Sequence, residues 1–218
     1  MPTGNYILND KKVPSVTTII GRFKNANGLI IWSNKLGLKG INYFDELSKA
    51  GDIGTNLHDL AELHILGKEY QVPDDPIVKN CFNQFLKWWK SLDYEVIWTE
   101  KKMGSIKLEC GGCPDLLVRK FNVEKNKDEI ILVDFKTSKD FYSDMLVQLS
   151  AYSELIRETQ NIVIDKAIIV RFPKDDDKFK VKEFSKKDLA MGLKQFKILR
   201  RAFDLDKELN KLMKRKKK

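Results

Sequence analysis

Residues 130–136 read Ile-Ile-Leu-Val-Asp-Phe-Lys, an apolar run that closes on an aspartate and, two positions later, a lysine. A short, continuously apolar run is typical of a strand buried on both faces. Side chains two positions apart in a strand share a face, so Asp134 and Lys136 project together while Phe135 points into the core. The stretch therefore predicts a core strand that delivers a carboxylate and an ammonium to one side of a sheet. Taken alone, it also fits an ordinary strand end with an ion pair.

A second aspartate, Asp115, lies nineteen positions upstream and follows the stretch Cys110-Gly111-Gly112-Cys113-Pro114. We expect a glycine-rich turn there, since glycine permits a bulge that re-aims the next side chain. Two adjacent carboxylates bind a hard divalent cation, and a lysine beside them can stabilise developing negative charge. This combination suits phosphodiester hydrolysis. The simpler alternative is a turn in which Asp115 only caps the backbone.

Two further segments carry polar side chains that could join such a site. His58 and Glu62 are four residues apart on an expected helix and so share its face. A neutral imidazole is a common metal ligand, although a single helix histidine is more often a packing residue. Glu100 lies in an expected strand ahead of the glycine stretch. It could bind a metal through water, or it could be a solvated strand charge.

A polar stripe follows on the next expected helix. Asp144, Gln148 and Tyr152 are spaced four residues apart and fall on one side of a helix with 3.6 residues per turn. Such a stripe could hold a phosphate, a base or the lysine of the preceding strand. Without the preceding strand it would be interpreted as a half-exposed helix face.

Composition favours a nucleic-acid partner. The 218-residue chain is 42% hydrophobic, has a net charge of +9, and has a pI of about 9.3. An excess of positive charge attracts polyanions, although surface lysines also serve solubility. Six of the eight residues 211–218 are basic, which is typical either of a phosphate-binding tail or of a solvated one. The apolar runs are too short to cross a bilayer and the three cysteines form no disulfide framework, so we expect a cytoplasmic protein.

Periodicity predicts the remaining elements. Residues 13–20 are β-branched behind a Pro-Ser turn or cap, and helical patterns cover residues 29–38, 52–66, 77–92, 141–158 and 186–213. Strand patterns cover residues 94–102, 106–110, 116–118, 130–135, 162–172 and 179–184. This order predicts a three-layer α/β/α sandwich with a mixed central sheet. We expect one domain over residues 1–218, with a mainly helical part at 1–92, a catalytic sheet and helix at 93–185, and a helix and basic tail at 186–218.

Four short motifs in this order resemble the PD-(D/E)xK nuclease superfamily, in its RecB-like branch of phage exonucleases and Cas4-type enzymes. The motifs are Gly54-Thr55-Asn56-Leu57-His58, Gly112-Cys113-Pro114-Asp115, Asp134-Phe135-Lys136-Thr137-Ser138 and Gln148-Leu149-Ser150-Ala151-Tyr152. With the opening Pro14-Ser15-Val16-Thr17-Thr18, the likeness spans residues 14–152. It implies a restriction-endonuclease-like core.

The resemblance also implies a site and an activity. Its metal ligands would be His58, Asp115, Asp134 and the carbonyl of Phe135, holding Mg²⁺ or Mn²⁺. Lys136 would activate the attacking water, Gln148 and Tyr152 would complete the catalytic site, and Glu100 and Glu62 would be accessory. The implied reaction is exonucleolytic hydrolysis of DNA, from single-stranded or duplex ends, in phage or bacterial recombination, replication or processing. A structure-specific or nicking endonuclease and a non-catalytic DNA-binding module remain the alternatives.

The number of cysteines distinguishes this chain from the relatives that hold an iron–sulfur cluster, and the spacing of two of them suggests one alternative function. Cas4-type enzymes hold an iron–sulfur cluster on four cysteines, and this sequence has three, so no cluster is expected. Cys110 and Cys113 form a C-x-x-C pair, which can be redox-active in thiol–disulfide oxidoreductases. A helix normally follows that pair, whereas Pro114 and an expected strand follow it here. A zinc site at the pair would need two further ligands.

Overall fold

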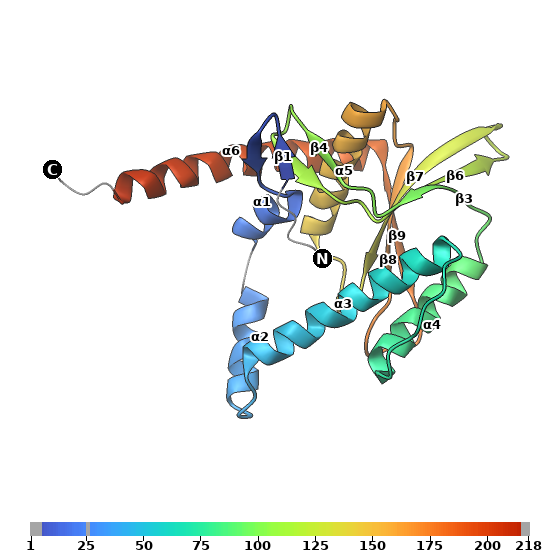
Figure 1. The fold of residues 1–218 in the computed structure, drawn as a ribbon, viewed down its shortest axis with the longest axis horizontal. Coiled ribbons are helices and arrows are strands. Elements are labelled where there is room, and N and C mark those ends of the chain that lie inside the picture. The colour runs from blue at the N-terminus through green and yellow to red at the C-terminus, as the bar shows by residue number, and fades with distance from the viewer. Residues whose placement is uncertain (1–5, 25–26, 215–218) are drawn as a thin grey trace.

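The computed structural model describes residues 6–24 and 27–214, and a five-stranded sheet lies at its centre (Figure 1). In spatial order the strands are β3 (Glu95–Thr99), β6 (Leu116–Asn122), β7 (Lys127–Lys136), β8 (Lys166–Arg171) and β9 (Lys180–Ser185). Strands β7 and β8 are parallel and the other neighbours are antiparallel. The sheet is therefore mixed, as the sequence predicts.

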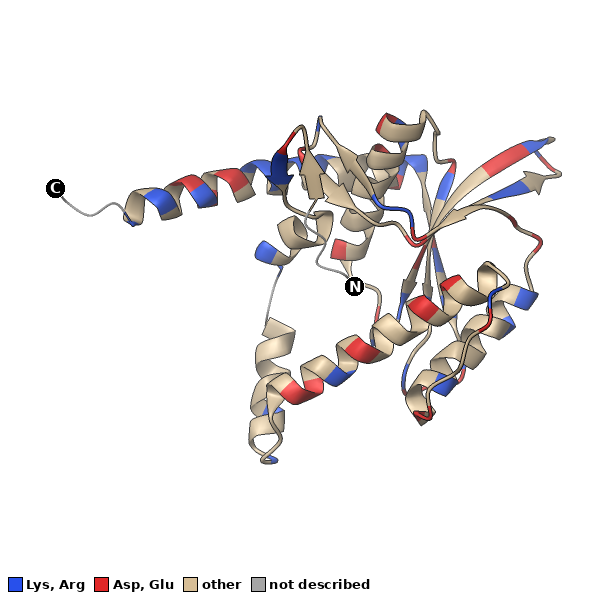
Figure 2. Cartoon of the chain, in the orientation of Figure 1, with Lys and Arg blue, Asp and Glu red and all other residues tan. Residues whose placement is uncertain are grey.

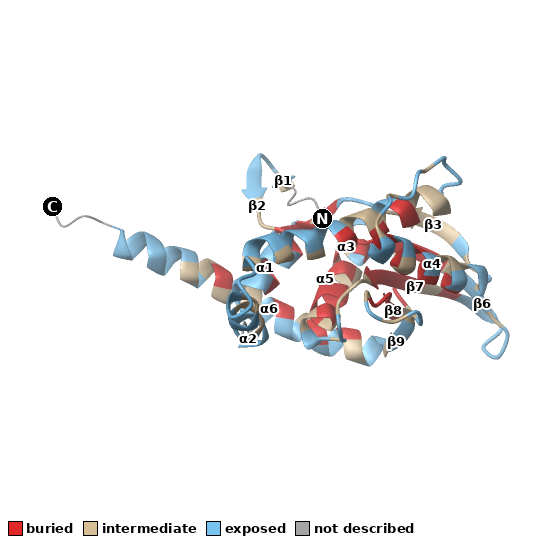
Figure 3. Cartoon of the chain, turned by 90° about the horizontal axis from the view of Figure 1, so that it is seen from below, coloured by how far each residue is buried: buried red, intermediate tan, exposed pale blue. Residues whose placement is uncertain are grey.

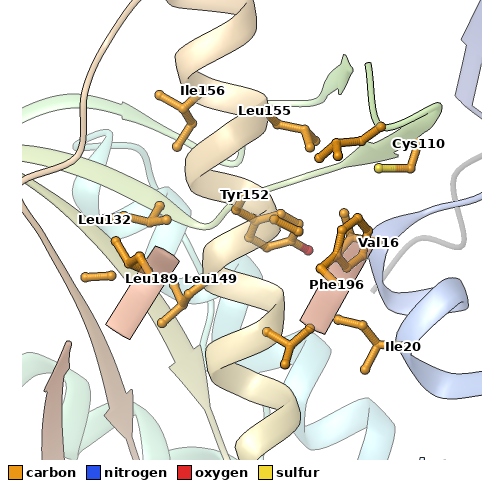
Figure 4. Close-up of a cluster of buried hydrophobic side chains, with 14 of the residues drawn as sticks. Val16, Ile20, Cys110, Leu132, Leu149, Tyr152, Leu155, Ile156, Leu189 and Phe196 are labelled. Carbon is orange, nitrogen blue, oxygen red and sulfur yellow. The ribbon is translucent and has the colours of Figure 1, made fainter. Parts of the chain in front are cut away.

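Helices cover both faces of this sheet. The helices α1 (Val16–Arg22), α5 (Ser143–Gln160) and α6 (Lys186–Met213) pack on one face, and α3 (Tyr43–Ile65) and α4 (Pro76–Lys90) pack on the other. Strand alternation supplies both cores, since Leu132 of β7 packs toward α5 while Ile131 and Val133 pack toward α3 and α4. Figure 3 shows buried residues on both sides of the strands, and Figure 4 shows the α5-side cluster. The predicted α/β sandwich is confirmed.

Local capping chemistry explains where several helices begin. Of residues 13–20, which the sequence left between a strand and a capped segment, Val13 ends β2 (Lys11–Val13) and residues 16–20 belong to α1. Ser15 caps that helix by accepting a hydrogen bond from the Thr18 amide. Strand β2 pairs with β1 (Tyr6–Leu8). Asp75 caps α4 ahead of Pro76, which suits the first turn of a helix.

The structure differs from the prediction most clearly around the glycine-rich stretch at residues 110–114. Instead of a strand at 106–110 followed by a turn, the structure has β4 (Met103–Ser105) and β5 (Cys110–Gly112), joined by a turn at 106–109. These strand positions require glycine because their neighbours leave no room for a side chain. A Cβ atom on Gly111 would lie 2.0 Å from the Tyr6 ring, and one on Gly112 would lie 2.5 Å from the Tyr152 ring.

Other element boundaries also differ from the prediction. Helix α3 begins at Tyr43 instead of residue 52, and it is capped by Asn42. Together with α2 (Asn27–Gly37), its first half projects from the body (Figure 1). The strand expected over 94–102 stops at Thr99, because Glu100 takes a left-handed φ of 43°. None of the described helices is long and apolar enough to span a membrane.

Candidate metal centre

Asp115 and Asp134 come together because β6 and β7 are antiparallel neighbours. Leu116 pairs with Val133 across the two strands, so the preceding Asp115 and the following Asp134 meet at the same end of the ladder. Asp115 Oδ2 accepts a hydrogen bond of 2.7 Å from the Phe135 amide, which fixes its carboxylate against β7. Both aspartates are almost fully buried. The nineteen-residue separation in sequence thus becomes a direct contact between the two segments.

His58 reaches the same point from α3. Its Nδ1 lies 3.2 Å from Glu100 Oε1 and 3.5 Å from Asp115 Oδ1, and its Nε2 lies 3.2 Å from the Phe135 carbonyl oxygen. Burial lowers the pKa of His58, but the charge of Asp115 and a hydrogen bond with Glu100 outweigh burial and raise this pKa to about 9. A protonated imidazole therefore holds the two acids and the carbonyl together.

Glu100 has a more central position than the sequence indicates. One ligand atom each from His58, Glu100 and Asp115 lies within 4.8 Å of the others, whereas Asp134 is not part of this group. The left-handed turn at Glu100 is held by its own amide, which donates to the Asp115 carbonyl over 2.7 Å. The sequence carries no clear signal for this, since a left-handed glutamate is uncommon.

Asp134 and Lys136 form a buried ion pair beside this group, with 2.6 Å between Lys136 Nζ and Asp134 Oδ2. Apart from this contact with each other, neither Asp134 nor Lys136 Nζ has a side-chain hydrogen-bond partner among the described residues. Burial raises the pKa of Asp134 to about 6, although Lys136 opposes that shift. For Lys136, burial lowers the pKa but Asp134 raises it above its ordinary value. The pair stays charged near neutral pH, yet its polar atoms are left incompletely satisfied.

Helix α5 adds Gln148 and Tyr152 to this face of the sheet. Gln148 Nε2 donates to the Tyr152 hydroxyl over 3.1 Å, and both side chains are buried. Burial and then the charge of Asp134 raise the pKa of Tyr152 well above its ordinary value, so the phenol stays protonated. Figure 4 shows its ring among the apolar side chains of the α5 core. Asp144 instead forms an ion pair of 2.8 Å with Lys24.

A pocket of about 250 Å³ opens onto His58, Glu100, Asp115 and Tyr152. Its wall also includes residues from the N-terminal segment, the start of α1, α3 and the β3–β6 connection: Tyr6, Ser15, Thr17, Thr55, Asp59, Glu62, Lys102, Gly112 and Cys113. The predicted accessory residue Glu62 is therefore part of the wall. Tyr6 was not found from sequence, and its only trace there is Gly111, against which its ring packs.

The two cysteines near this pocket do not have the properties of a redox pair. Burial raises the pKa of Cys110 and of Cys113 to about 12, and Glu100 adds to the shift at Cys113. Cys113 Sγ lies 3.4 Å from Glu100 Oε2, to which it donates. Reactive cysteines need a lowered pKa, so this environment disfavours thiol–disulfide chemistry.

No protein-family model and no curated protein matches this sequence. Solved structures that partly resemble it include a candidate exonuclease from Eubacterium rectale, with a TM-score of 0.42 and 12% identity over 86% of this chain and 72% of that one. The protein SSO0001 gives 0.38 and 13%, over 88% and 78%. An alkaline exonuclease from Laribacter hongkongensis gives 0.32 and 12%, over 70% and 84%. These TM-scores and sequence identities are too low to assign an activity to this chain.

Proposed function

We propose that this chain is a metal-dependent DNA nuclease of the PD-(D/E)xK type. The observation that carries the proposal is the juxtaposition of His58, Glu100 and Asp115 within 4.8 Å of one another and next to the buried pair of Asp134 and Lys136. Imidazole and carboxylate ligands beside a buried ammonium suit hydrolysis of a phosphodiester.

The donor set fits Mg²⁺ or Mn²⁺. Asp115, Asp134 and the Phe135 carbonyl supply the oxygen ligands that hard cations prefer, and His58 supplies one nitrogen. Asp134 Oδ1 has no partner among the described residues and Oδ2 has only Lys136, which leaves carboxylate lone pairs that a cation could take. Glu100 would bind directly or through water, with Glu62 further out along the pocket wall. His58 would lose its proton on becoming a ligand.

The side chains around the metal ligands would orient the attacking water and stabilise the charge that develops on the phosphate. A bound cation polarises a phosphoryl oxygen and lowers the pKa of a bound water. Lys136 orients the attacking water and places positive charge where the phosphate becomes more negative. Gln148 and Tyr152, already linked by a hydrogen bond of 3.1 Å, hold Lys136 or a phosphate oxygen from the α5 side.

The net charge of +9 supports DNA as the substrate. We propose exonucleolytic attack on single-stranded or duplex ends in the cytoplasm of a bacterium or a phage-infected host, by one domain spanning residues 1–218. An internal nick in a closed circle would instead indicate a structure-specific or nicking endonuclease.

Labelled substrates test the proposal. Linear single strands and duplexes carrying a 5′ or 3′ label, and covalently closed circles, are incubated with Mg²⁺, Mn²⁺ or EDTA, alongside Asp134→Asn. We expect cleavage of the linear DNA with either metal and none in EDTA or with the variant. Binding of every substrate with no metal-dependent cleavage would refute the proposal and favour a binding module.

A further inference from the structure

The outer side of α6 carries an apolar stripe that nothing in the described chain covers. The stripe runs at alternating intervals of four and three residues through Met191, Gln195, Ile198, Ala202, Leu205, Leu209 and Leu212. Its large side chains are exposed by 51% to 70% of their surface. An a/d repeat of this length, polar only at Gln195, is typical of a coiled-coil seam.

This stripe is distinct from the side of α6 that packs on the body. The packed side consists of Leu189, Gly192, Phe196 and Phe203, which are all buried. Past Phe203 that side becomes polar, with Asp206 and Asn210, and the helix projects from the body (Figures 1 and 3). The outer stripe stays apolar over the same turns. The part of α6 beyond Phe203 thus carries an exposed apolar stripe although it does not pack on the body of its own chain.

We infer that this seam binds α6 of a second copy of the chain as an antiparallel two-helix coiled coil. The 3.5-residue repeat of the stripe matches the slight left-handed supercoil by which two helices keep such a seam in contact. The inference goes beyond the proposed nuclease activity and does not depend on it.

Side-chain size sets the antiparallel arrangement. In that register Ala202 of each copy faces Leu205 of the other, so the small side chain lies opposite a large one, and Ile198 faces Leu209. A parallel arrangement would place Ala202 against Ala202 and leave a gap in the centre. Since cavities in packed apolar layers are destabilising, the antiparallel register is preferred.

Charge supports the same register. Arg201 and Glu208 flank the seam, and neither has an ion-pair or hydrogen-bond partner among the described residues. An antiparallel pair brings Arg201 of each copy to Glu208 of the other, twice over. A parallel pair would instead bring Arg201 to Asp206, which already holds Arg22 within its own chain. Figure 2 shows the alternation of basic and acidic residues along this half of α6.

Light scattering coupled to gel filtration tests the seam on the full chain. We expect a dimer of twice the 25.3 kDa chain mass at micromolar concentration. Leu209→Asp should raise the dissociation constant by about 100-fold or more, because the substitution occurs twice in a symmetric seam and each copy weakens binding at least tenfold. Met213→Asp is the matched control, since Met213 is 85% exposed on the same helix but outside the stripe. Thermal melting verifies that both variants fold. A monomer at every concentration, or a dimer that Leu209→Asp leaves intact, would overturn the inference.

A charge exchange tests the register. Arg201→Glu should weaken the dimer, because two glutamates would then face each other on each flank, and the double variant Arg201→Glu/Glu208→Arg should restore it. Restoration by Arg201→Glu/Asp206→Arg instead would show a parallel pair and overturn the antiparallel arrangement.

Discussion

The buried pair of Asp134 and Lys136 is the clearest sign at the residue scale that this end of the sheet is not built for stability alone. Taking two charges out of water is costly, and the cost is recovered only when the remaining polar atoms are satisfied. Here Asp134 Oδ1 lacks a hydrogen-bond partner among the described residues, and Asp134 Oδ2 and Lys136 Nζ have only each other. Incomplete satisfaction at a buried charge pair is what a site reserved for a ligand requires.

The substitution Lys136→Ala should lower the proposed DNA cleavage while leaving the affinity for DNA nearly unchanged. The lysine is buried and contacts Asp134, whereas affinity for DNA depends on charge spread over the whole surface. We expect cleavage to fall by at least about 100-fold, the usual scale for losing one group that stabilises transition-state charge. DNA binding, measured by fluorescence anisotropy in EDTA, should change by less than about threefold. Turnover close to that of the unmodified protein would refute the role given to Lys136.

His58 predicts the pH dependence of the metal-free protein. Its pKa rises from 6.5 to about 9 on folding, so its stabilising contribution is complete below pH 6.5 and is lost as the pH rises through 9. In EDTA, the melting temperature should fall between pH 6.5 and 9.5, and His58→Gln should flatten that fall. His64→Gln is the control, because the pKa of His64 is lowered by burial instead of raised. An unchanged slope in His58→Gln would contradict the assigned contacts.

At the scale of elements, strand β5 shows how glycine chemistry can be misinterpreted from sequence. The pair Gly111-Gly112 is typical of a turn, yet it lies in a strand, where the rings of Tyr6 and Tyr152 take the space that side chains would need. That space is defined by residues about 100 positions before and 40 positions after in the sequence. No local pattern could have supplied it.

Gly112→Ala tests this packing. Its Cβ would lie 2.5 Å from a Tyr152 ring carbon, so the ring or the strand must shift, and we expect a loss of about 1–3 kcal/mol in the free energy of unfolding. Gly51→Ala is the matched control, because Gly51 is an exposed position of α3 with nothing within 4 Å of its Cβ direction. It should gain about 0.5–1 kcal/mol through helix propensity. Urea denaturation gives both values, and equal effects would contradict the packing described.

Elements with strong local periodicity were predicted well. The apolar run at residues 130–136 is the last part of β7, and Asp134 and Lys136 do share the face toward α5, as strand alternation requires. The resemblance implied that His58 lies near Asp115, and the structure places His58 Nδ1 3.5 Å from Asp115 Oδ1. That the two residues bind a metal stays a prediction. Glu100 was underrated because its position depends on a left-handed backbone turn, which sequence does not encode locally.

For the whole molecule, the net charge of +9 predicts that the proposed binding of DNA depends on salt. Residues 215–218 of the expected basic tail lie outside the described residues, so its contribution is a matter for measurement. Deleting residues 214–218 removes five basic side chains and leaves the outer stripe of α6 intact. We expect weaker DNA binding and a shallower slope of log affinity against log salt, by about 0.7–0.9 for each phosphate that the shortened chain no longer neutralises. An unchanged slope would mean that the tail is solvated and touches no phosphate.

The proposed function requires that one divalent ion binds where α3, β7 and the β3–β6 connection meet. Crystals grown with Mn²⁺ test it directly through anomalous scattering at the manganese edge. We expect an anomalous peak within about 2.0–2.6 Å of ligand atoms from His58, Asp115 and Asp134. A protein with intact His58, Asp115 and Asp134 that shows no peak there at saturating Mn²⁺, or binds the ion elsewhere, would contradict it.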